Sequence, residues 1–104
     1  MAKTAEPELG LAVMRVLASR STGEATVRTL IKHVPEYVNL TAEDHAVSDK
    51  RPNEEMWEQR ERNLKSHDKT PGNVIGEGFV DRPKRGTYCL TAAGRLHLQH
   101  KGLL

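Results

Sequence analysis

The sequence contains a single cysteine and no long apolar run, and each shortage excludes a class of protein. Cys89 has no second cysteine to pair with, which excludes the small secreted domains that depend on internal disulfides. A membrane-spanning helix needs roughly 18 consecutive apolar residues, and no segment approaches that length. Gly10 and Arg15 interrupt the first apolar stretch, which therefore lacks the core of a signal peptide. We expect a cytoplasmic protein that is not bound to a membrane.

Aromatic residues are also scarce, and the chain is short. With 104 residues it accommodates one small domain, which excludes a two-domain enzyme. Hydrophobic residues make up 37% and charged residues 29%, a composition typical of a globular domain with a well-solvated surface. We expect a single domain over residues 1–104, with an ordered core at about 7–101. Because only four residues are aromatic, each is expected at a structural junction or a contact site.

The net charge of +2 conceals an uneven distribution along the chain. Residues 1–49 carry five basic side chains against seven acidic ones, whereas residues 50–104 carry eleven against seven. From Arg82 onward there are five basic residues and no acidic residue. A basic C-terminal half is typical of a surface that faces a polyanion, although many solvated helices are basic as well.

Apolar spacing predicts four helices in the first two thirds of the chain, at about residues 9–19, 27–34, 41–47 and 54–66. We expect Pro7 in the first turn of the first helix, Thr26 as the N-cap of the second and Pro35 at its end.

The helix predicted at 54–66, with Asn53 as its N-cap, places Met56, Trp57, Arg60 and Leu64 on one side. We expect Trp57 in the core. The stem of Arg60 is expected to pack there too, while its guanidinium reaches a carboxylate.

After a predicted turn at 68–73 and a short helical segment at 74–78, the spacing of hydrophobic residues changes from the helical repeat to the alternation of strands. Residues 79–81 and 87–90 read as a β-hairpin with its tip at 82–86, and alternation places Tyr88 and Leu90 toward the core and Thr87 and Cys89 outside. A last helix, capped by Thr91, is predicted from residue 92 to about 101, with Leu96 packing inward. The predicted class is therefore mainly α (α+β): a winged helix–turn–helix with a C-terminal β-hairpin wing and a final helix.

Three motifs resemble, in order and spacing, the N-terminal domain of Mrr-like restriction proteins. They are Trp57-x-x-Arg60-x-x-Asn63-Leu64, then EGFV at residues 77–80, then RGTYCLTAAGR at residues 85–95. The resemblance covers residues 9–98 and implies a winged helix that binds double-stranded DNA. Related proteins join this domain to a nuclease domain or use it in restriction-associated proteins. This sequence contains no nuclease domain, so cleavage is not implied, and residues 66–76 look like an insertion between helix and strand.

The best candidates for DNA contact are the cations at the hairpin tip, Arg82, Lys84 and Arg85. Pro83 stiffens this tip, and Gly86 supplies the positive φ that such a turn needs. Three cations on a stiff hairpin can contact phosphates at little entropic cost. The alternative is an ordinary solvated hairpin.

A second group lies at the end of the predicted fourth helix and in the turn after it. Basic and amide side chains suit guanine edges, adenine edges or phosphates when they project from a helix in the major groove. The sequence does not separate base contacts from phosphate contacts, and a solvated helix face is the alternative. This group contains Arg62, Lys65, Ser66, His67, Lys69 and Asn73.

Residue patterns for catalysis or a bound cofactor are lacking. His97 and His100 share a helix face downstream of Cys89, but they do not make up the four ligands of a structural zinc site. No glycine-rich phosphate loop with its lysine is present, and Cys89 has no neighbouring nucleophile motif. We therefore expect no metal, no cofactor and no enzymatic activity.

The sequence predicts a module that binds double-stranded DNA, either alone or with a nuclease or another restriction-system protein. Two alternatives remain: a protein–protein adaptor, and a small metal-dependent enzyme in which three histidines converge on one ion. A basic stripe joining Lys65, Lys69 and the hairpin would favour DNA, whereas an exposed patch with Tyr37 or Val38 would favour a protein partner. The DNA target and the oligomeric state stay open.

Overall fold

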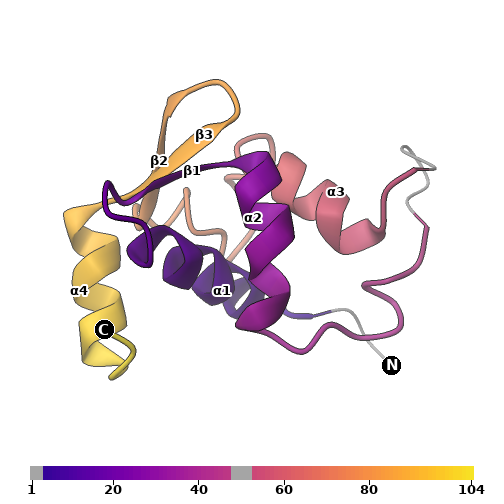
Figure 1. The fold of residues 1–104 in the computed structure, drawn as a ribbon, viewed down its shortest axis with the longest axis horizontal. Helices are drawn as coiled ribbons and strands as arrows, with labels where there is room; N and C mark the ends of the chain where they lie inside the picture. The colour runs from indigo at the N-terminus through magenta and orange to yellow at the C-terminus, as the bar shows by residue number, and fades with distance from the viewer. Residues whose placement is uncertain (1–3, 48–52) are drawn as a thin grey trace.

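The computed structural model describes residues 4–47 and 53–104, which form an α+β domain (Figure 1). Within these residues, four α-helices and a short 3₁₀ helix accompany a three-stranded sheet. The elements in chain order are α1 (Glu6–Ala18), β1 (Glu24–Thr26), α2 (Val27–His33), the 3₁₀ helix η1 (Val34–Glu36), α3 (Met56–Arg62), β2 (Val80–Lys84), β3 (Thr87–Leu90) and α4 (Ala92–His100).

The sheet is antiparallel, with strand order β1-β3-β2. The β2–β3 hairpin was expected and is present, although β2 continues to Lys84, so that only Arg85 and Gly86 form the turn. Gly86 has φ +78°, as expected for such a turn. The sequence analysis missed β1, whose three residues pair with Thr87, Tyr88 and Cys89. A strand this short contains too few residues to show an alternating pattern.

The core is built on α1, whose buried side chains meet the sheet, α2 and α4. Trp57 and Tyr88 are 5% and 2% exposed, which confirms that both belong to the core. The start of α2 is also as predicted, because the hydroxyl of Thr26 accepts a hydrogen bond from the N–H of Thr29 at 3.3 Å. Pro35 does not follow directly on α2, since it lies within η1.

The predicted third helix at 41–47 is wrong. Residues 42–45 form hydrogen-bonded turns, and Val47 makes an isolated antiparallel bridge with Glu55. The hydroxyl of Thr41 accepts a hydrogen bond from the N–H of Asp44 at 3.2 Å, so the expected capping interaction exists but no helix follows it.

The predicted helix at 54–66 is too long at both ends. Its N-cap is Glu55 rather than Asn53, and it ends at Arg62. Asn63 leaves helical geometry at φ −104° and ψ 18°, and turns follow it. The Asn73 amide, nine residues beyond Leu64, donates to the Leu64 carbonyl at 3.1 Å and holds these turns.

The inward face of α4 also differs from the prediction. Leu96 is 51% exposed, whereas Leu98 is fully buried. Gly94 decides this orientation, because a Cβ built there would lie 2.1 Å from the Phe79 carbonyl oxygen. The helix thus rests on the backbone of residue 79 through its Gly94 and Leu98 side.

On β3, the predicted alternation holds for Tyr88 and for Leu90, which is half-buried and packs against the core, but not for Thr87. Thr87, expected outside, is 8% exposed. Thr87 lies in the central strand, between Thr26 and Lys84 of its two partners. Because β1 and β2 flank Thr87 on both sides, the three-stranded sheet buries this residue, whereas a two-stranded hairpin would leave one side of it open.

Glu61 is a buried acid that the sequence analysis did not single out. Its side chain in α3 is 0% exposed, and neither carboxylate oxygen has a hydrogen-bond partner. Burial raises the pKa of Glu61 to about 8, the neighbouring Arg60 charge lowers it, and the Glu6 charge raises it further. At neutral pH this carboxyl is therefore largely protonated in the folded protein.

We expect Glu61→Gln to remove a pH dependence of stability. Because its folded-state pKa is raised, Glu61 stabilises the fold fully below its ordinary pKa of 4.5 and loses that contribution as the pH rises toward 8. The amide cannot ionise, so at about pH 9 the variant should be more stable than the parent by roughly 2–4 kcal/mol. Urea unfolding followed by circular dichroism from acid to alkaline pH measures this. Glu43→Gln, at an exposed position, is the control. Parallel pH profiles for Glu61→Gln and the parent would contradict the assignment.

Candidate nucleic-acid interface

The β2–β3 hairpin projects from the body of the domain and carries three cations near its tip (Figure 1). The pairing of β2 with β3 shifts register between Asp81 and Lys84, so that two residues of β2 face one of β3. Pro83, which has no N–H for the ladder, lies in this bulge. Side chains from Asp81 to Arg85 are all exposed.

The hairpin cations have no acidic partner within the described ranges. Neither Arg82, Lys84 nor Arg85 makes an ion pair there, and the nearby Asp81 carboxylate accepts a hydrogen bond from the backbone N–H of Arg82 at 2.8 Å. A cation without a carboxylate partner can contact a phosphate without first breaking an ion pair.

The start of α2 adjoins the hairpin turn, a juxtaposition that the sequence analysis missed together with β1. The N–H of Val27 donates to the Gly86 carbonyl at 3.1 Å. Arg28 and Lys32 follow on α2, one helical turn apart and both exposed, and neither forms an ion pair in the part of the chain described. In the sequence, only the i, i+4 spacing of Arg28 and Lys32 could have indicated that these two cations share a helix face.

The second predicted group lies in a different setting from the one expected. Because α3 ends at Arg62, residues 65–69 occupy turns after the helix instead of its last turns. Ser66, His67 and Lys69 are exposed there. The structure thus keeps these three on the surface but not on a helix.

Two cations of this group are already paired with acids. Arg62 donates two hydrogen bonds to one Glu54 oxygen, at 2.6 and 2.9 Å, and this bonding raises the pKa of its guanidinium. Lys65 Nζ lies 3.0 Å from an Asp68 oxygen, and the resulting hydrogen bond lowers the pKa of Asp68. The Lys65–Asp68 pair is exposed and contributes little, so a phosphate can displace the Asp68 carboxylate. The Glu54 side chain is only 14% exposed, so releasing Arg62 from it is more costly.

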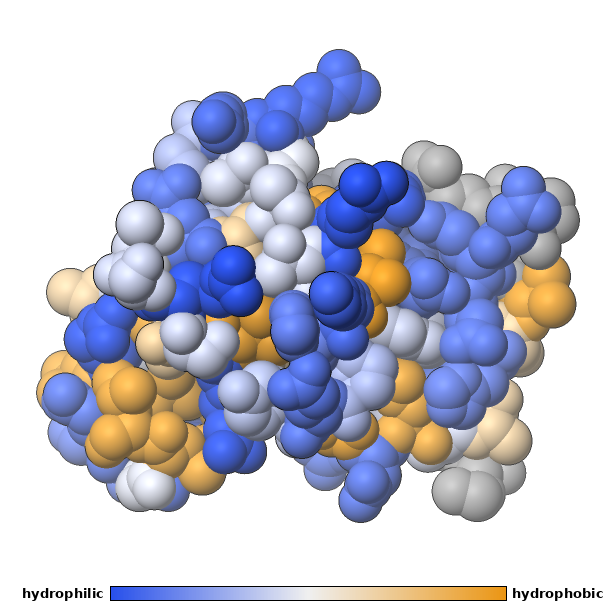
Figure 2. All heavy atoms as spheres, viewed as in Figure 1, coloured by the Kyte–Doolittle hydropathy of each residue, from blue (hydrophilic) through white to orange (hydrophobic). Residues whose placement is uncertain are grey.

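Tyr88 connects the hairpin with the turns after α3. Burial raises the pKa of its hydroxyl, while the Arg82 charge and a hydrogen bond with the Lys65 backbone lower it. The Tyr88 hydroxyl is therefore close to the Lys65 backbone and near the Arg82 charge. Figure 2 shows hydrophilic side chains over the hairpin, α2 and α3, whereas apolar ones gather over α4.

Asn73 is the one candidate that the structure removes from the surface. It is 1% exposed. Its amide nitrogen donates to Leu64, and its oxygen accepts from the N–H groups of Ile75 and Gly76 at 2.8 and 3.2 Å. These bonds hold the turns after α3 together, so Asn73 acts inside the protein and does not reach a ligand.

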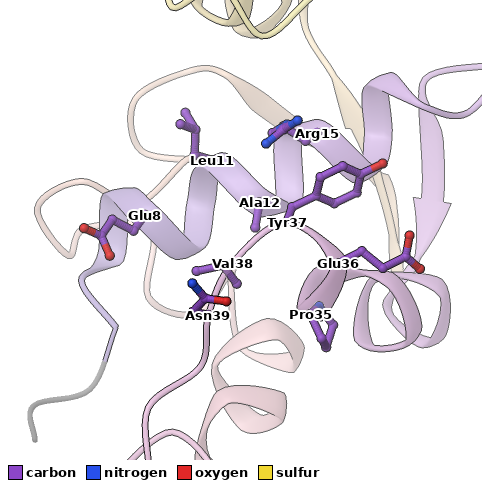
Figure 3. A pocket seen from close by; sticks show the side chains of 9 residues that line it. All are labelled: Glu8, Leu11, Ala12, Arg15, Pro35, Glu36, Tyr37, Val38 and Asn39. Atoms are coloured by element: carbon purple, nitrogen blue, oxygen red, sulfur yellow. The ribbon is translucent and has the colours of Figure 1, made fainter.

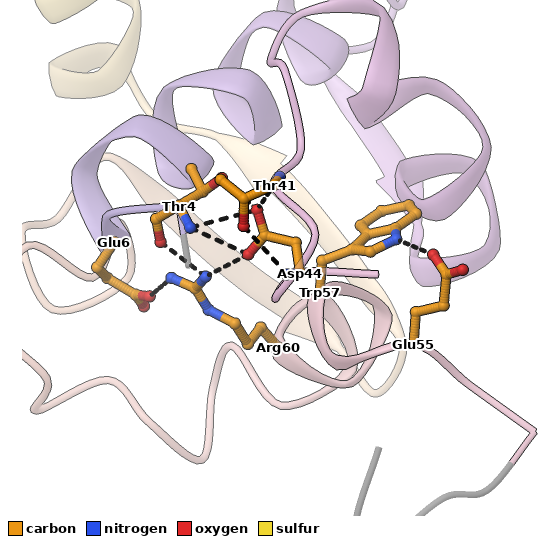
Figure 4. Close-up of polar contacts among 7 residues, drawn as sticks. All are labelled: Thr4, Glu6, Thr41, Asp44, Glu55, Trp57 and Arg60. Carbon is orange, nitrogen blue, oxygen red and sulfur yellow. Dashed lines mark hydrogen bonds and ion pairs between the residues drawn. The ribbon is translucent and has the colours of Figure 1, made fainter. Parts of the chain in front are cut away.

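A buried charged cluster fixes the position of α3 (Figure 4). Arg60 donates to the Thr4 carbonyl and to a Glu6 oxygen, both at 2.8 Å, and lies 3.7 Å from Asp44. The expected packing of the Arg60 stem with its guanidinium on a carboxylate is confirmed. Asp44 also accepts hydrogen bonds from the Thr4 N–H and hydroxyl and from the Thr41 N–H.

The Asp44 carboxylate stays ionised although it is fully buried. Burial raises its pKa, but the hydrogen bonds from Thr4 and Thr41 together outweigh this effect and lower the pKa below its ordinary value. An ionised carboxylate with several donors and a neighbouring guanidinium joins three parts of the chain.

No group of three or more His, Cys, Asp or Glu side chains in residues 4–47 and 53–104 is arranged to hold a metal ion. His97 stacks on Phe79, with ring centroids 4.3 Å apart. Burial and the charges of Asp81 and Glu24 raise the pKa of the Cys89 thiol, which makes it a poor nucleophile. Among the described residues, no helix has the length and apolar character to cross a bilayer.

No family model, curated protein or solved structure matches this chain.

We expect Asp44→Ala to lower the free energy of unfolding by roughly 3–5 kcal/mol, because it leaves the buried Thr4 donors and the Thr41 N–H without an acceptor and removes one of the two carboxylates beside Arg60. Because the folded-state pKa of Asp44 is lowered, its contribution is present above the ordinary pKa of 3.8 and is lost as the pH falls below it. Urea unfolding at neutral and acid pH measures both effects. Glu43→Ala, at the exposed neighbouring position, should change stability by less than about 0.5 kcal/mol. Equal effects of the two variants would contradict the role of Asp44.

Proposed function

We propose that this chain is a winged-helix module that binds double-stranded DNA and catalyses no reaction. The observation that carries the proposal is the projecting hairpin, whose cations Arg82, Lys84 and Arg85 are exposed and without an acidic partner in the described residues. Cations on a preorganised tip lose little entropy when they contact phosphates.

The order of elements supports a winged helix. A helix, a short strand, two helices and a hairpin follow one another, and β1 joins the hairpin on the β3 side. In such an arrangement α3 and the turns after it face the major groove, while the hairpin contacts the backbone. The acids Glu54 and Glu58 at the start of α3 repel phosphates, so its C-terminal end and Lys69 are the parts directed at DNA.

Arg28 extends the proposed surface to α2. The hydrogen bond between Val27 and Gly86 places the first turn of α2 beside the hairpin turn. The hairpin, α2 and the turns after α3 would then form one basic surface. On it, the hairpin cations and Arg28 have no ion-pair partner among the described residues, whereas Arg62 and Lys65 first have to exchange a carboxylate for a phosphate.

The proposed biological setting is a restriction system, in which the module acts alone or beside a nuclease. This part of the proposal rests on the resemblance of residues 57–64, 77–80 and 85–95 to the N-terminal domain of Mrr-like proteins. Comparison of methylated and unmethylated duplexes of the same sequence tests it. A preference for the methylated duplex would support a sensor of modified DNA, and equal affinities would argue against one.

We expect Lys84→Ala/Arg85→Ala to weaken DNA binding about equally for all sequences, because phosphate contacts carry no base information. Fluorescence anisotropy of labelled duplexes over a range of salt concentrations measures this. The parent should show a slope of log affinity against log salt of about −3 to −5, and the double variant a slope shallower by about 2. Arg28→Ala should make it shallower by about 1.

Arg95→Ala/Lys101→Ala provides the matched control, since it also removes one exposed arginine and one exposed lysine, but from α4 and its C-cap. It lowers the net charge equally and should retain the parental slope. Equal losses in both double variants would mean that only net charge matters and would remove the hairpin from the proposal. Absence of binding even at low salt would reject the DNA function.

A protein–protein adaptor is the second candidate, and one observation favours it. Tyr37 and Val38 are half-buried and line a groove between α1 and the residues after α2 (Figure 3). Half-exposed aromatic and aliphatic side chains around a hollow are typical of protein contact surfaces.

A further inference from the structure

Glu61 lies in the last turn of α3, on the side of the helix that faces the core. Trp57 and Glu61 are the buried residues of this seven-residue helix, and they lie one turn apart. Within the described residues, neither oxygen of the fully buried Glu61 carboxyl has a hydrogen-bond partner. A carboxylate in this place would have no donor to replace its lost hydration, so the fold accommodates Glu61 in its protonated form.

The neighbouring cation, Arg60, cannot neutralise Glu61, because two other acids already use it. The Arg60 guanidinium donates to a Glu6 oxygen at 2.8 Å and lies 3.7 Å from an Asp44 oxygen (Figure 4). The Arg60 charge lowers the pKa of Glu61, but the Glu6 charge raises it. An ionised Glu61 would therefore be a third carboxylate around one guanidinium.

The elements that pack on α3 supply no further partner for Glu61 among the described residues. On β3, the Glu61 charge acts on the Tyr88 phenol and raises its pKa, while the charge of the exposed Arg82 lowers it. α2 also packs on α3. The charged side chains of α2 are exposed or bonded elsewhere: Arg28 and Lys32 are exposed, and His33 bonds to Glu36.

The two ends of α3 are held to different degrees. At its start, the N–H of Met56 donates to the Ala46 carbonyl at 2.8 Å. The N–H of Trp57 donates to the Asp44 carbonyl at 3.1 Å. At its end, Asn63 has left helical geometry, with φ −104° and ψ 18°, and only its N–H bonds back to the helix, at 3.0 Å. The last turn can therefore unwind while the start of the helix stays in place.

We propose that ionisation of Glu61 unwinds the last turn of α3 and releases the turns after it, which makes this end of the helix a pH-sensitive switch. Release brings the carboxylate into water, where its pKa returns to the ordinary 4.5, whereas burial holds it at about 8. The ratio of released to closed protein therefore rises by roughly a hundredfold between about pH 6 and pH 9. The buried charged cluster around Asp44 holds the start of α3 over this range, because the lowered pKa of Asp44 keeps it ionised.

Hydrogen exchange of the full chain without DNA, measured by mass spectrometry at about pH 6 and pH 9, tests the switch. Parent and Glu61→Gln are compared at the same pH, so that the intrinsic exchange rates of the amides cancel. At the higher pH, the segment that contains Asn63 should exchange about tenfold or more faster in the parent than in Glu61→Gln. At the lower pH the two proteins should exchange alike, because Glu61 is then protonated in both states of α3 to a much larger extent.

Low concentrations of urea separate release of this end of α3 from unfolding of the whole domain. Local unwinding exposes little surface, so exchange around Asn63 should not respond to urea, whereas exchange within α1 should accelerate with it. Equal urea dependence of the two segments in the parent at the higher pH would overturn the proposal. Equal exchange around Asn63 in the parent and Glu61→Gln would overturn it as well.

Two further variants complete the design. Glu61→Leu, which cannot ionise either, should behave like Glu61→Gln, so that the effect is assigned to the charge and not to the amide. Glu43→Gln removes an exposed acid from the turns at 42–45 and should behave like the parent. An effect of Glu43→Gln as large as that of Glu61→Gln would mean that net charge alone controls exchange, and would overturn the assignment to Glu61.

The consequence for DNA binding rests on the proposed function, because the released turns carry Lys65 and Lys69 of the proposed surface. Between about pH 7 and pH 9 the parent should lose about threefold or more affinity for a labelled duplex beyond any loss shown by Glu61→Gln. Exchange is measured without DNA, so absence of DNA binding would reject the proposed function and leave the switch standing. The same pH dependence of binding in both proteins would overturn the link between the switch and DNA.

Discussion

The position of α3 depends on the buried carboxylate of Asp44. It accepts hydrogen bonds from Thr4 and Thr41 and lies beside Arg60, which in turn holds Glu6. One acid therefore connects the residues before α1, the turns at 42–45 and α3, three segments that are distant in the sequence. Removal of Asp44 would leave the buried Thr4 donors and the Thr41 N–H without an acceptor, which is more costly than the loss of a surface ion pair. The turns that follow α3 are positioned by the same cluster of charged residues, because α3 precedes them directly.

Asp44 and Glu61 show how the same functional group takes opposite ionisation states in one small domain. Both side chains are fully buried. Asp44 has several N–H and O–H donors, which outweigh burial and lower its pKa, whereas Glu61 has none and its pKa rises to about 8. Burial alone therefore does not determine the charge of an acid; the local supply of donors does. As the pH rises, the Glu61 side of α3 loses stability while the Asp44 side keeps its charge.

Local signals in the sequence predicted the features that depend on neighbouring residues. The Thr26 cap, the hairpin with Gly86 in its turn and the buried Trp57 need only short-range patterns. The turns after α3 were missed, and the Asn73 bond that holds them reaches back nine residues to Leu64. The burial of Leu98 instead of Leu96 depends on contact of α4 with residue 79. No periodicity within a helix encodes such distant contacts, since they arise only when the chain is folded.

The candidate site likewise combines features that short-range sequence patterns reveal with features that only the fold determines. The hairpin cations could be recognised because they lie within four residues of one another, but their availability depends on the fold. Among the described residues, Lys84 and Arg85 have no acidic partner, whereas Arg62 and Lys65 are each paired with one. Arg28 could not be assigned to the site before β1 was known, because only that strand brings α2 to the hairpin turn. Cations of equal formal charge therefore differ in how readily they bind a phosphate. A paired cation must first release its carboxylate, whereas an unpaired cation releases only water and counterions. For this reason the hairpin, more than the turns after α3, should set the salt dependence of the DNA binding that we propose.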